Sequence, residues 1–292
     1  MYVFVVGMER CGTHSAANIL RSAASAPAHV IHEEPPTWCR EARLLFEGRD
    51  FRTPAFKKKI AMWRDYHKKC RLVCEANHRL SFFTSILMRE FAPDCRFVFL
   101  VRDPMETIHS RVATWAHYTH FPELYPRQYW EEMEVPEIKR EFNDFRISPP
   151  WDYKGKALGE LYAWEWIETY KYARNELQMI PSSCRKIMRC EELSNRFHNL
   201  FDYIGPDYFK LTDEVVGWAK TKSDSIQNRT GKHFTVSFAK KTLDESYNTI
   251  KSVILDAVTQ LPKTDPMMVE MDAWVEGYLR QGTNKYATRI FV

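Results

Sequence analysis

The chain has 292 residues, of which 45% are hydrophobic and 27% are charged. This balance excludes a wholly disordered protein, and the length suffices for one large α/β domain or two small ones without disulfide support. A formal net charge of +4 is too small for a protein that coats a polyanion, so any anion binding must be local.

The sequence contains no targeting or membrane-spanning pattern. No uncharged apolar stretch reaches about 18 residues, so we expect no transmembrane helix and no membrane partner. The first residues lack the pattern of a signal peptide, and the seven cysteines include no C-x-x-C pair. We therefore expect a cytoplasmic protein in a reducing compartment.

The N-terminal half alternates short apolar runs with helical patterns. These runs predict strands at 2–6, 28–31, 71–74, 96–101 and 186–188, and helices at 14–24, 80–91, 104–117 and 156–179. The alternation is typical of βαβ units, so the predicted fold class is α/β, with a central, mostly parallel sheet flanked by helices in a single domain spanning 1–292.

Residues 118–155 interrupt this rhythm. Five of the fifteen prolines fall there, at positions 122, 126, 136, 149 and 150. Such a segment is either a plain surface insertion or a lid over an acceptor. From about 208 the pattern is helical again, interrupted by a polar stretch at 222–232.

Polar residues follow every predicted strand. They occupy positions 7–15, 32–34, 75–78, 102–103 and 189–192. Parallel strands bring their carboxyl ends to one edge of a sheet, and ligands bind there in open α/β sheets. The sequence therefore predicts a polar active-site crevice at that edge.

The first polar cluster resembles a phosphate-binding P-loop, G-x-x-x-x-G before a helix. Gly7 and Gly12 have this spacing, and backbone N–H groups at such a helix start bind phosphate. Loops that bind nucleoside triphosphates continue with Lys and then Ser or Thr. Thr13 and His14 stand there instead, so the γ-phosphate lysine and the Mg²⁺ ligand are missing, and Arg10 carries the loop's permanent positive charge. This favours a metal-free transfer of a less charged group.

Four segments together resemble the sulfotransferases, which use 3′-phosphoadenosine-5′-phosphosulfate (PAPS). Residues 10–15 resemble the family's 5′-phosphosulfate loop. Residues 97–110 resemble its 3′-phosphate motif, with an Arg closing a buried strand and a Ser eight positions later. Residues 189–193 resemble its late Arg-Tyr-Glu-Asp-Leu segment, and residues 228–231 its C-terminal Arg-Lys-Gly loop. The four occur in the family's order between residue 1 and about 235.

The resemblance implies the P-loop nucleotide-kinase-like sulfotransferase fold, closest to the carbohydrate-type and bacterial members. It implies PAPS as co-substrate, the desulfated nucleotide (PAP) as product, no required metal, and a hydroxyl or amine of a small-molecule or saccharide acceptor. The nucleotide-binding residues that it implies are Arg10, Cys11, Gly12, Thr13, His14, Ser15, Arg102, Ser110, Arg229, Thr230 and Gly231. The sequence departs from the family at Cys11, His14, Ser15 and Cys190, and Trp164 or Trp166 is a candidate for the missing contact with adenine.

The resemblance also implies the catalytic groups. Arg10 takes the place of the cation beside the leaving phosphate, and Glu34, followed by Pro35, resembles the glutamate that acts as base in carbohydrate-type members. Glu33 and His32 come next as candidate bases, and Glu75, His78 and His14 remain alternatives. Along an extended segment, Glu33 and Glu34 are expected to point in opposite directions.

Other functions are less favoured. The departures from the family leave two alternatives, a P-loop kinase acting on a small molecule and a nucleotide-binding module without catalysis. The spacing of His29 and His32, and of His117 and His120, fits no zinc site. Nucleic-acid binding is disfavoured because the basic run at 57–59 is short and typical of a solvated helix face.

Overall fold

The computed structural model describes residues 1–25, 27–120, 158–210, 212–213, 216–217 and 246–281. Arg229, Thr230, Gly231 and positions 121–155 of the predicted insertion lie outside these ranges.

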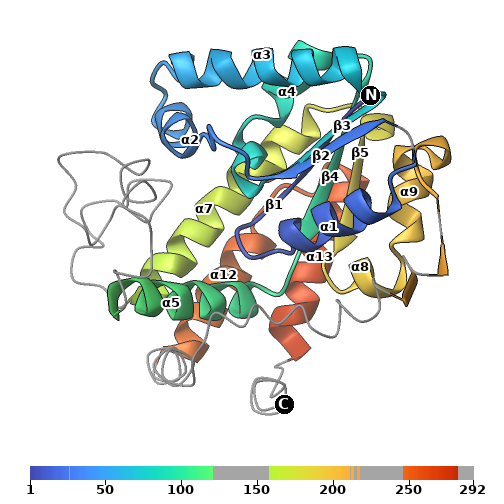
Figure 1. Cartoon of the computed structure of the whole chain (residues 1–292). Helices are drawn as coiled ribbons and strands as arrows, with labels where there is room; N and C mark the ends of the chain where they lie inside the picture. The colour runs from blue at the N-terminus through green and yellow to red at the C-terminus, as the bar shows by residue number, and fades with distance from the viewer. Residues whose placement is uncertain (26, 121–157, 211, 214–215, 218–245, 282–292) are drawn as a thin grey trace.

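The described residues form a five-stranded parallel sheet (Figure 1). The order across the sheet is β2 (Ala28–His32), β3 (Leu72–Ala76), β1 (Tyr2–Gly7), β4 (Cys95–Val101) and β5 (Arg185–Arg189). Every pairing is parallel. The predicted α/β class is confirmed, and each of the five predicted strands is present within two residues of its expected bounds.

Four helices match the sequence prediction closely. They are α1 (Thr13–Ala23), α4 (Thr84–Phe91), α5 (Pro104–His120) and α7 (Leu158–Gln178). A separate 3₁₀ helix, η1 (His78–Phe82), precedes α4. A short 3₁₀ turn at Ser182–Cys184 precedes β5. The segment after β5 contains α8 (Glu192–Asn195), α9 (His198–Ile204), α12 (Tyr247–Thr259) and α13 (Pro266–Gln281), with a second 3₁₀ turn at Pro206–Tyr208.

Two helices between β2 and β3 were not predicted: α2 (Cys39–Phe46) and α3 (Pro54–Lys69). The start of α3 is nevertheless encoded locally. The Thr53 hydroxyl accepts a hydrogen bond from the Phe56 N–H at 3.2 Å, and Pro54 occupies the first helical position. A side-chain cap followed by proline is a common start signal for a helix.

The strand order decides which helices cover which face. Crossover connections between parallel strands are right-handed. The connection from β1 to β2 crosses the sheet in one direction and the later connections cross it in the opposite direction, so their helices lie on opposite faces. Accordingly α1 packs against β1, β2 and β3, whereas α3, α4 and α7 cover the other face (Figure 1). The carboxyl ends of β1 and β4 thus lie at the point where the chain reverses direction across the sheet, which is where ligands bind in open α/β sheets.

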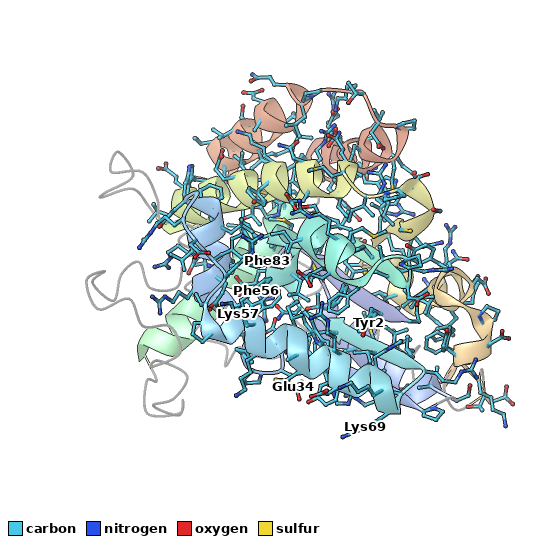
Figure 2. All side chains as sticks on the ribbon, turned by 90° about the horizontal axis from the view of Figure 1, so that it is seen from above. Tyr2, Glu34, Phe56, Lys57, Lys69 and Phe83 are labelled. Carbon is cyan, nitrogen blue, oxygen red and sulfur yellow. The ribbon has the colours of Figure 1, made fainter. Side chains whose placement is uncertain are left out.

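The core is aromatic on the α3 side. Trp38 and Trp63 are almost wholly buried, and their ring centroids lie 5.3 Å apart. Phe56 and Phe83 complete this cluster, with centroids 6.0 Å apart (Figure 2). Burial of one such side chain contributes roughly 1.5–3 kcal/mol, so this layer anchors α2 and α3 to the sheet.

The basic run at 57–59 is not a uniformly solvated face, and that prediction is wrong for its last member. Lys57 and Lys58 are exposed, but Lys59 is 1% exposed and its Nζ lies 2.8 Å from Glu75 Oε2. Glu75 also accepts hydrogen bonds from Trp63 Nε1 at 2.8 Å and Asn77 Nδ2 at 3.2 Å. The lysine is buried because it neutralises a carboxylate in the core.

A second buried ion pair ties the C-terminal helix to the rest of the domain. Arg174 on α7 and Asp272 on α13 are both fully buried and join at 3.1 Å. The Tyr170 hydroxyl also donates to Asp272, at 2.9 Å. In the part of the chain that the structure describes, no helix has the length and apolar character needed to cross a bilayer.

Candidate active site

The loop between β1 and α1 depends on two glycines. Gly12 has a φ of 98°, which favours glycine, and a Cβ there would lie 2.7 Å from Cys190 Sγ. A Cβ at Gly7 would lie 2.5 Å from the Leu100 carbonyl oxygen. The loop therefore follows a path close to β4 and to the segment after β5 that residues with side chains cannot take.

The loop opens onto the first turn of α1. Among the described residues, no side chain caps this helix. The N–H groups of the first turn and the helix dipole together favour an anion there. Ser81 fixes the start of the loop, because its Oγ accepts from Gly7 N–H at 3.0 Å and donates to the Gly7 carbonyl at 2.7 Å.

Three predicted nucleotide-binding residues converge on this loop. Arg10 Nε donates to Ser110 Oγ at 2.9 Å, which joins the loop to α5. Arg102, at the end of β4, donates through Nη1 to the Arg10 carbonyl at 2.8 Å. Its Nη2 lies 2.9 Å from Glu106 Oε2. Arg10 and Arg102 therefore lie close together beyond the ends of the neighbouring strands β1 and β4.

The cysteines of the loop region are packing residues. Cys11 is fully buried, and burial raises the pKa of its thiol far above the ordinary value. Cys190 packs behind Gly12, and burial raises its pKa to about 12. Both thiols are neutral near neutral pH, so Cys11 offers a ligand only its backbone.

The remaining loop residues lead towards β2. Thr13 is buried, and its Oγ1 lies 3.3 Å from His32 Nε2. His14 is exposed, and its ring meets the His32 ring edge-on at 4.9 Å. Ser15 is half-buried in the first turn of α1. The structure thus brings His32 against the loop.

Glu33 faces the polar residues after β3. Its backbone has a φ of 50°, which turns the chain at the end of β2. Its Oε1 lies 2.6 Å from His78 Nδ1 and its Oε2 lies 3.0 Å from Arg79 Nη1. Burial by itself would raise the pKa of Glu33, but the charges of His78 and Arg79 hold it well below its usual range. Burial lowers the pKa of His32, in opposition to the nearby Glu33 carboxylate.

Glu34 contacts a different element. The Tyr66 hydroxyl of α3 donates to its carboxylate at 3.2 Å, and Lys59 Nζ donates to its backbone carbonyl. The carboxylates of the adjacent residues Glu33 and Glu34 therefore contact different elements of the structure. Glu75, the alternative from β3, is fully buried against Lys59 rather than at the loop.

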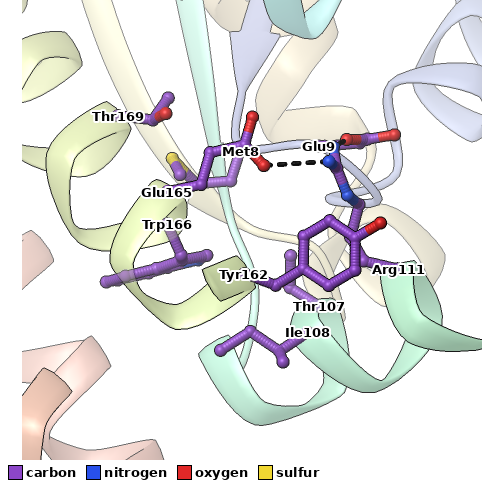
Figure 3. A pocket seen from close by; sticks show the side chains of 9 residues that line it. All are labelled: Met8, Glu9, Thr107, Ile108, Arg111, Tyr162, Glu165, Trp166 and Thr169. Carbon is purple, nitrogen blue, oxygen red and sulfur yellow. Dashed lines mark hydrogen bonds and ion pairs between the residues drawn. The ribbon is translucent and has the colours of Figure 1, made fainter. Parts of the chain in front are cut away.

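Sequence reasoning missed a second contact between the loop and α5. Arg111 Nη1 forms an ion pair with Glu9, and its Nη2 lies 2.8 Å from Glu165 Oε2 on α7 (Figure 3). The guanidinium carbon lies 4.5 Å from the Tyr162 ring centroid. The sequence held a local signal for this contact, because Glu9 and Arg111 are the immediate neighbours of the predicted site residues Arg10 and Ser110. The pairing itself depends on the approach of α5 to the loop.

The structure also places Asp103, one of the polar residues after β4, and Trp166, a candidate for the contact with adenine. Asp103 is buried at the start of α5, where it accepts from Met105 N–H at 2.8 Å, and burial, reinforced by Glu106, raises its pKa to about 6. Trp166 is buried and stacks on Tyr170 with centroids 4.8 Å apart. Within the described ranges, no group of three or more His, Cys, Asp or Glu side chains is placed to hold a metal ion.

Comparison with known proteins adds similarities of fold. No family model and no curated protein matches the chain. Among solved structures, the chain is similar to mouse sulfotransferase SULT7A1 complexed with PAP, with a TM-score of 0.48 and 10% identity over 94% of this chain and 88% of the other. A sulfotransferase domain from the curacin biosynthetic pathway gives 0.40 and 11%, over 94% and 96% of the two chains.

A third similar structure is a sulfotransferase from Alicyclobacillus acidocaldarius, with a TM-score of 0.39 and 16% identity over 77% of this chain and 92% of the other. All three TM-scores are below 0.5, so these similarities do not establish a family.

Proposed function

We propose that the protein is a sulfotransferase that moves the sulfuryl group of PAPS to a hydroxyl or amine of a small-molecule or saccharide acceptor. The observation that carries this proposal is the convergence of Arg10, Arg102 and Ser110 on a phosphate loop that lacks the lysine and the Mg²⁺ ligand of nucleoside triphosphatases.

The residues present fit the nucleotide. The first turn of α1 and the Arg10 guanidinium would hold the 5′-phosphosulfate, since both stabilise negative charge beside the uncapped helix start. Arg102 and Ser110 would hold the 3′-phosphate, and Arg102 can do so through two parallel N–H groups. A bound phosphate would compete with Glu106 for Arg102.

The chemistry requires three actions from the protein. The acceptor oxygen or nitrogen forms a bond to sulfur while the bond from sulfur to the bridging phosphate oxygen breaks, and the acceptor proton moves to a base. Arg10 would offset the charge that develops on the leaving phosphate. The loop and α1 would hold the donor in line with the acceptor.

The base is proposed from the residues at the end of β2. The sequence favours Glu34, whose carboxylate contacts Tyr66 of α3. The described contacts favour His32, which touches Thr13 of the loop and whose lowered pKa leaves the imidazole neutral and able to accept a proton. Glu33 lies 3.8 Å from His32 Nε2, where it would stabilise the protonated ring. With its pKa held so low, Glu33 is itself a weak base.

The deciding experiment uses PAPS with a radiolabelled sulfate group, a pool of hydroxylated and amine acceptors, and excess EDTA. We expect the label to move to an acceptor without a divalent metal. The parallel reaction contains ATP labelled at its γ-phosphate with Mg²⁺. Phosphate transfer from ATP without sulfate transfer would instead establish a kinase, and the absence of PAP binding by calorimetry would overturn the proposal directly.

A further inference from the structure

The 3₁₀ helix η1 contacts both parts of the proposed site. Ser81 holds Gly7 at the start of the phosphate loop through two hydrogen bonds. His78 and Arg79, at the other end of η1, hold Glu33 at the end of β2. The element that follows β3 therefore fixes the phosphate loop and the end of β2 relative to each other.

The start of η1 is itself fixed to the core by Asn77, which is fully buried. Its Oδ1 accepts from Arg79 N–H at 3.0 Å, and its Nδ2 donates to Glu75 Oε1 at 3.2 Å. Its backbone N–H donates to the Val5 carbonyl of β1 at 2.9 Å. Glu75 is in turn paired with Lys59. The backbone that carries the Arg79 side chain is therefore held in place by buried hydrogen bonds.

The Glu33 carboxylate is bound through both of its oxygens. Oε1 lies 2.6 Å from His78 Nδ1, and Oε2 lies 3.0 Å from Arg79 Nη1. Oε1 also lies 3.8 Å from His32 Nε2. The φ of 50° at Glu33 is rare for a residue with a Cβ, and such strain persists only where the surroundings hold it. The side chain is 25% exposed, so without these contacts the carboxylate would be free to turn towards solvent.

The charged and titratable groups that surround His32 are Glu33, His14, Arg79 and Arg21. Glu33 is the negative member of this set. It favours the protonated ring, in opposition to burial, which lowers the pKa of His32. The positive charge of Arg79 disfavours the protonated ring directly, but its contact with Glu33 holds the favourable charge near the ring. The position of Glu33 therefore decides how readily His32 takes a proton.

We propose that Arg79 is a positioning residue for the proposed base: through its contact with Glu33 Oε2 it keeps Glu33 Oε1 beside the His32 ring. The word base rests on the proposed function; the coupling of these three side chains does not. With the Nε2 hydrogen directed at Glu33, Nδ1 of His32 holds the lone pair that accepts a proton. The acceptor proton would move to the ring, and Glu33 would remain ionised beside the imidazolium.

NMR titration of the His32 ring tests the proposal without any substrate, and His32→Gln identifies its signal. Glu33→Gln should lower the pKa of His32 by about one pH unit, because an opposite charge within ~4–6 Å raises the pKa of a histidine. In an Arg79→Met protein the same Glu33→Gln change should lower it by less than half as much, because the carboxylate is no longer held beside the ring. The direct charge of Arg79 is absent from both proteins of this second pair, so it cancels. An equal shift in the two backgrounds would overturn the proposal.

Arg21→Met is the matched control. Arg21 also carries a positive charge that acts on His32, but its side chain donates to the Val30 carbonyl at 3.1 Å and to Asn18 Oδ1 at 3.0 Å. Its removal should leave the effect of Glu33→Gln on the pKa of His32 unchanged. A reduction as large as in Arg79→Met would refute the positioning role. Arg79→Gln repeats the test if Arg79→Met folds poorly.

Sulfate transfer from labelled PAPS, measured with the same variants, separates the two proposals. Arg79→Met should lower kcat by about tenfold, a part of the ~10²–10⁴-fold that a general base supplies, with PAP affinity unchanged. The acidic limb of its rate profile should move together with the pKa measured by NMR. Coupling without sulfate transfer supports the positioning role and overturns the proposed function. Sulfate transfer without coupling overturns the positioning role and leaves the proposed function standing.

Discussion

Arg10 Nε and Ser110 Oγ, a hundred positions apart in the chain, lie 2.9 Å from each other. This contact joins the loop after β1 to the helix after β4, the two strands that are neighbours in the centre of the sheet. One residue away on each side, Glu9 pairs with Arg111. The loop and α5 are thus held together by two adjacent side-chain contacts at the proposed nucleotide site.

The first prediction concerns nucleotide affinity. Arg102→Ala should weaken PAP binding by about ten- to a hundredfold, because a hydrogen bond to a charged group contributes roughly 1.5–3 kcal/mol. Ser110→Ala should weaken it less. Arg10→Ala should reduce turnover more than PAP affinity, since its charge acts mainly as the leaving group develops.

Isothermal calorimetry measures these affinities. Arg40→Ala and Ser22→Ala, both at exposed positions of other helices, are the matched controls. Unchanged affinity in Arg102→Ala and Ser110→Ala would place the 3′-phosphate elsewhere.

The second prediction concerns the base. His32→Gln should lower kcat by about a hundredfold or more with PAP binding preserved, as expected for loss of general-base catalysis. The lowered pKa of His32 keeps the imidazole neutral at neutral pH, so the wild-type rate should fall only as the pH drops below the ordinary histidine value of about 6.5. The variant should lack this acidic limb.

Glu34→Gln is the comparison variant for the base, and rate profiles against pH decide between the two. Normal turnover in His32→Gln, together with a hundredfold loss in Glu34→Gln, would assign the base to Glu34 as the sequence favours.

The third prediction concerns Gly12. Gly12→Ala should destabilise the protein and abolish PAP binding, because a Cβ would stand 2.7 Å from Cys190 Sγ at a φ of 98°. Adding Cys190→Ala should recover part of the stability but not all, since the backbone strain remains. Gly277→Ala in α13 meets no atom within 4 Å and should be neutral or stabilising by up to about 1 kcal/mol. Thermal and urea unfolding measure all three, and a Gly12→Ala protein with normal stability would show that the loop relaxes freely.

The fourth prediction concerns the buried pair of Lys59 and Glu75. Lys59→Met should reduce the free energy of unfolding by about 3–5 kcal/mol at neutral pH, because it leaves a carboxylate uncompensated in the core. Burial already raises the pKa of Glu75 against the effect of Lys59, and loss of the lysine raises it further. The folded variant then binds its proton more tightly than the unfolded chain, so its stability should be highest in acid and fall as the pH rises through that pKa.

Urea unfolding at several pH values measures this effect. Lys58→Met removes the same charge from an exposed neighbour and should change stability by less than about 0.5 kcal/mol. A pH-independent loss in Lys59→Met would mean that Glu75 does not carry the effect.

The sequence by itself was sufficient to predict the strands of the sheet and the loop after β1. Strands such as Tyr2–Gly7 and Cys95–Val101 are buried along nearly their whole length. Because a strand buried on both faces requires a continuous apolar run, such strands can be predicted from the sequence. The loop could also be predicted from Gly7 and Gly12, because their positive φ angles are a local backbone requirement that favours glycine. The helices α2 and α3 were not predicted, although Thr53 and Pro54 marked the start of α3, because their apolar residues are spread among charged ones.

Only the tertiary structure decided which side chains meet. Adjacent glutamates at 33 and 34 are equivalent in the sequence, but one faces His78 and the other Tyr66. Lys57, Lys58 and Lys59 look alike, but the third is buried with Glu75. The contacts of Arg10 and of Arg111 with residues far along the chain exist because β4 lies beside β1 and α5 returns over the loop. Local patterns report the environment of each segment, whereas these partners depend on the order of strands across the sheet.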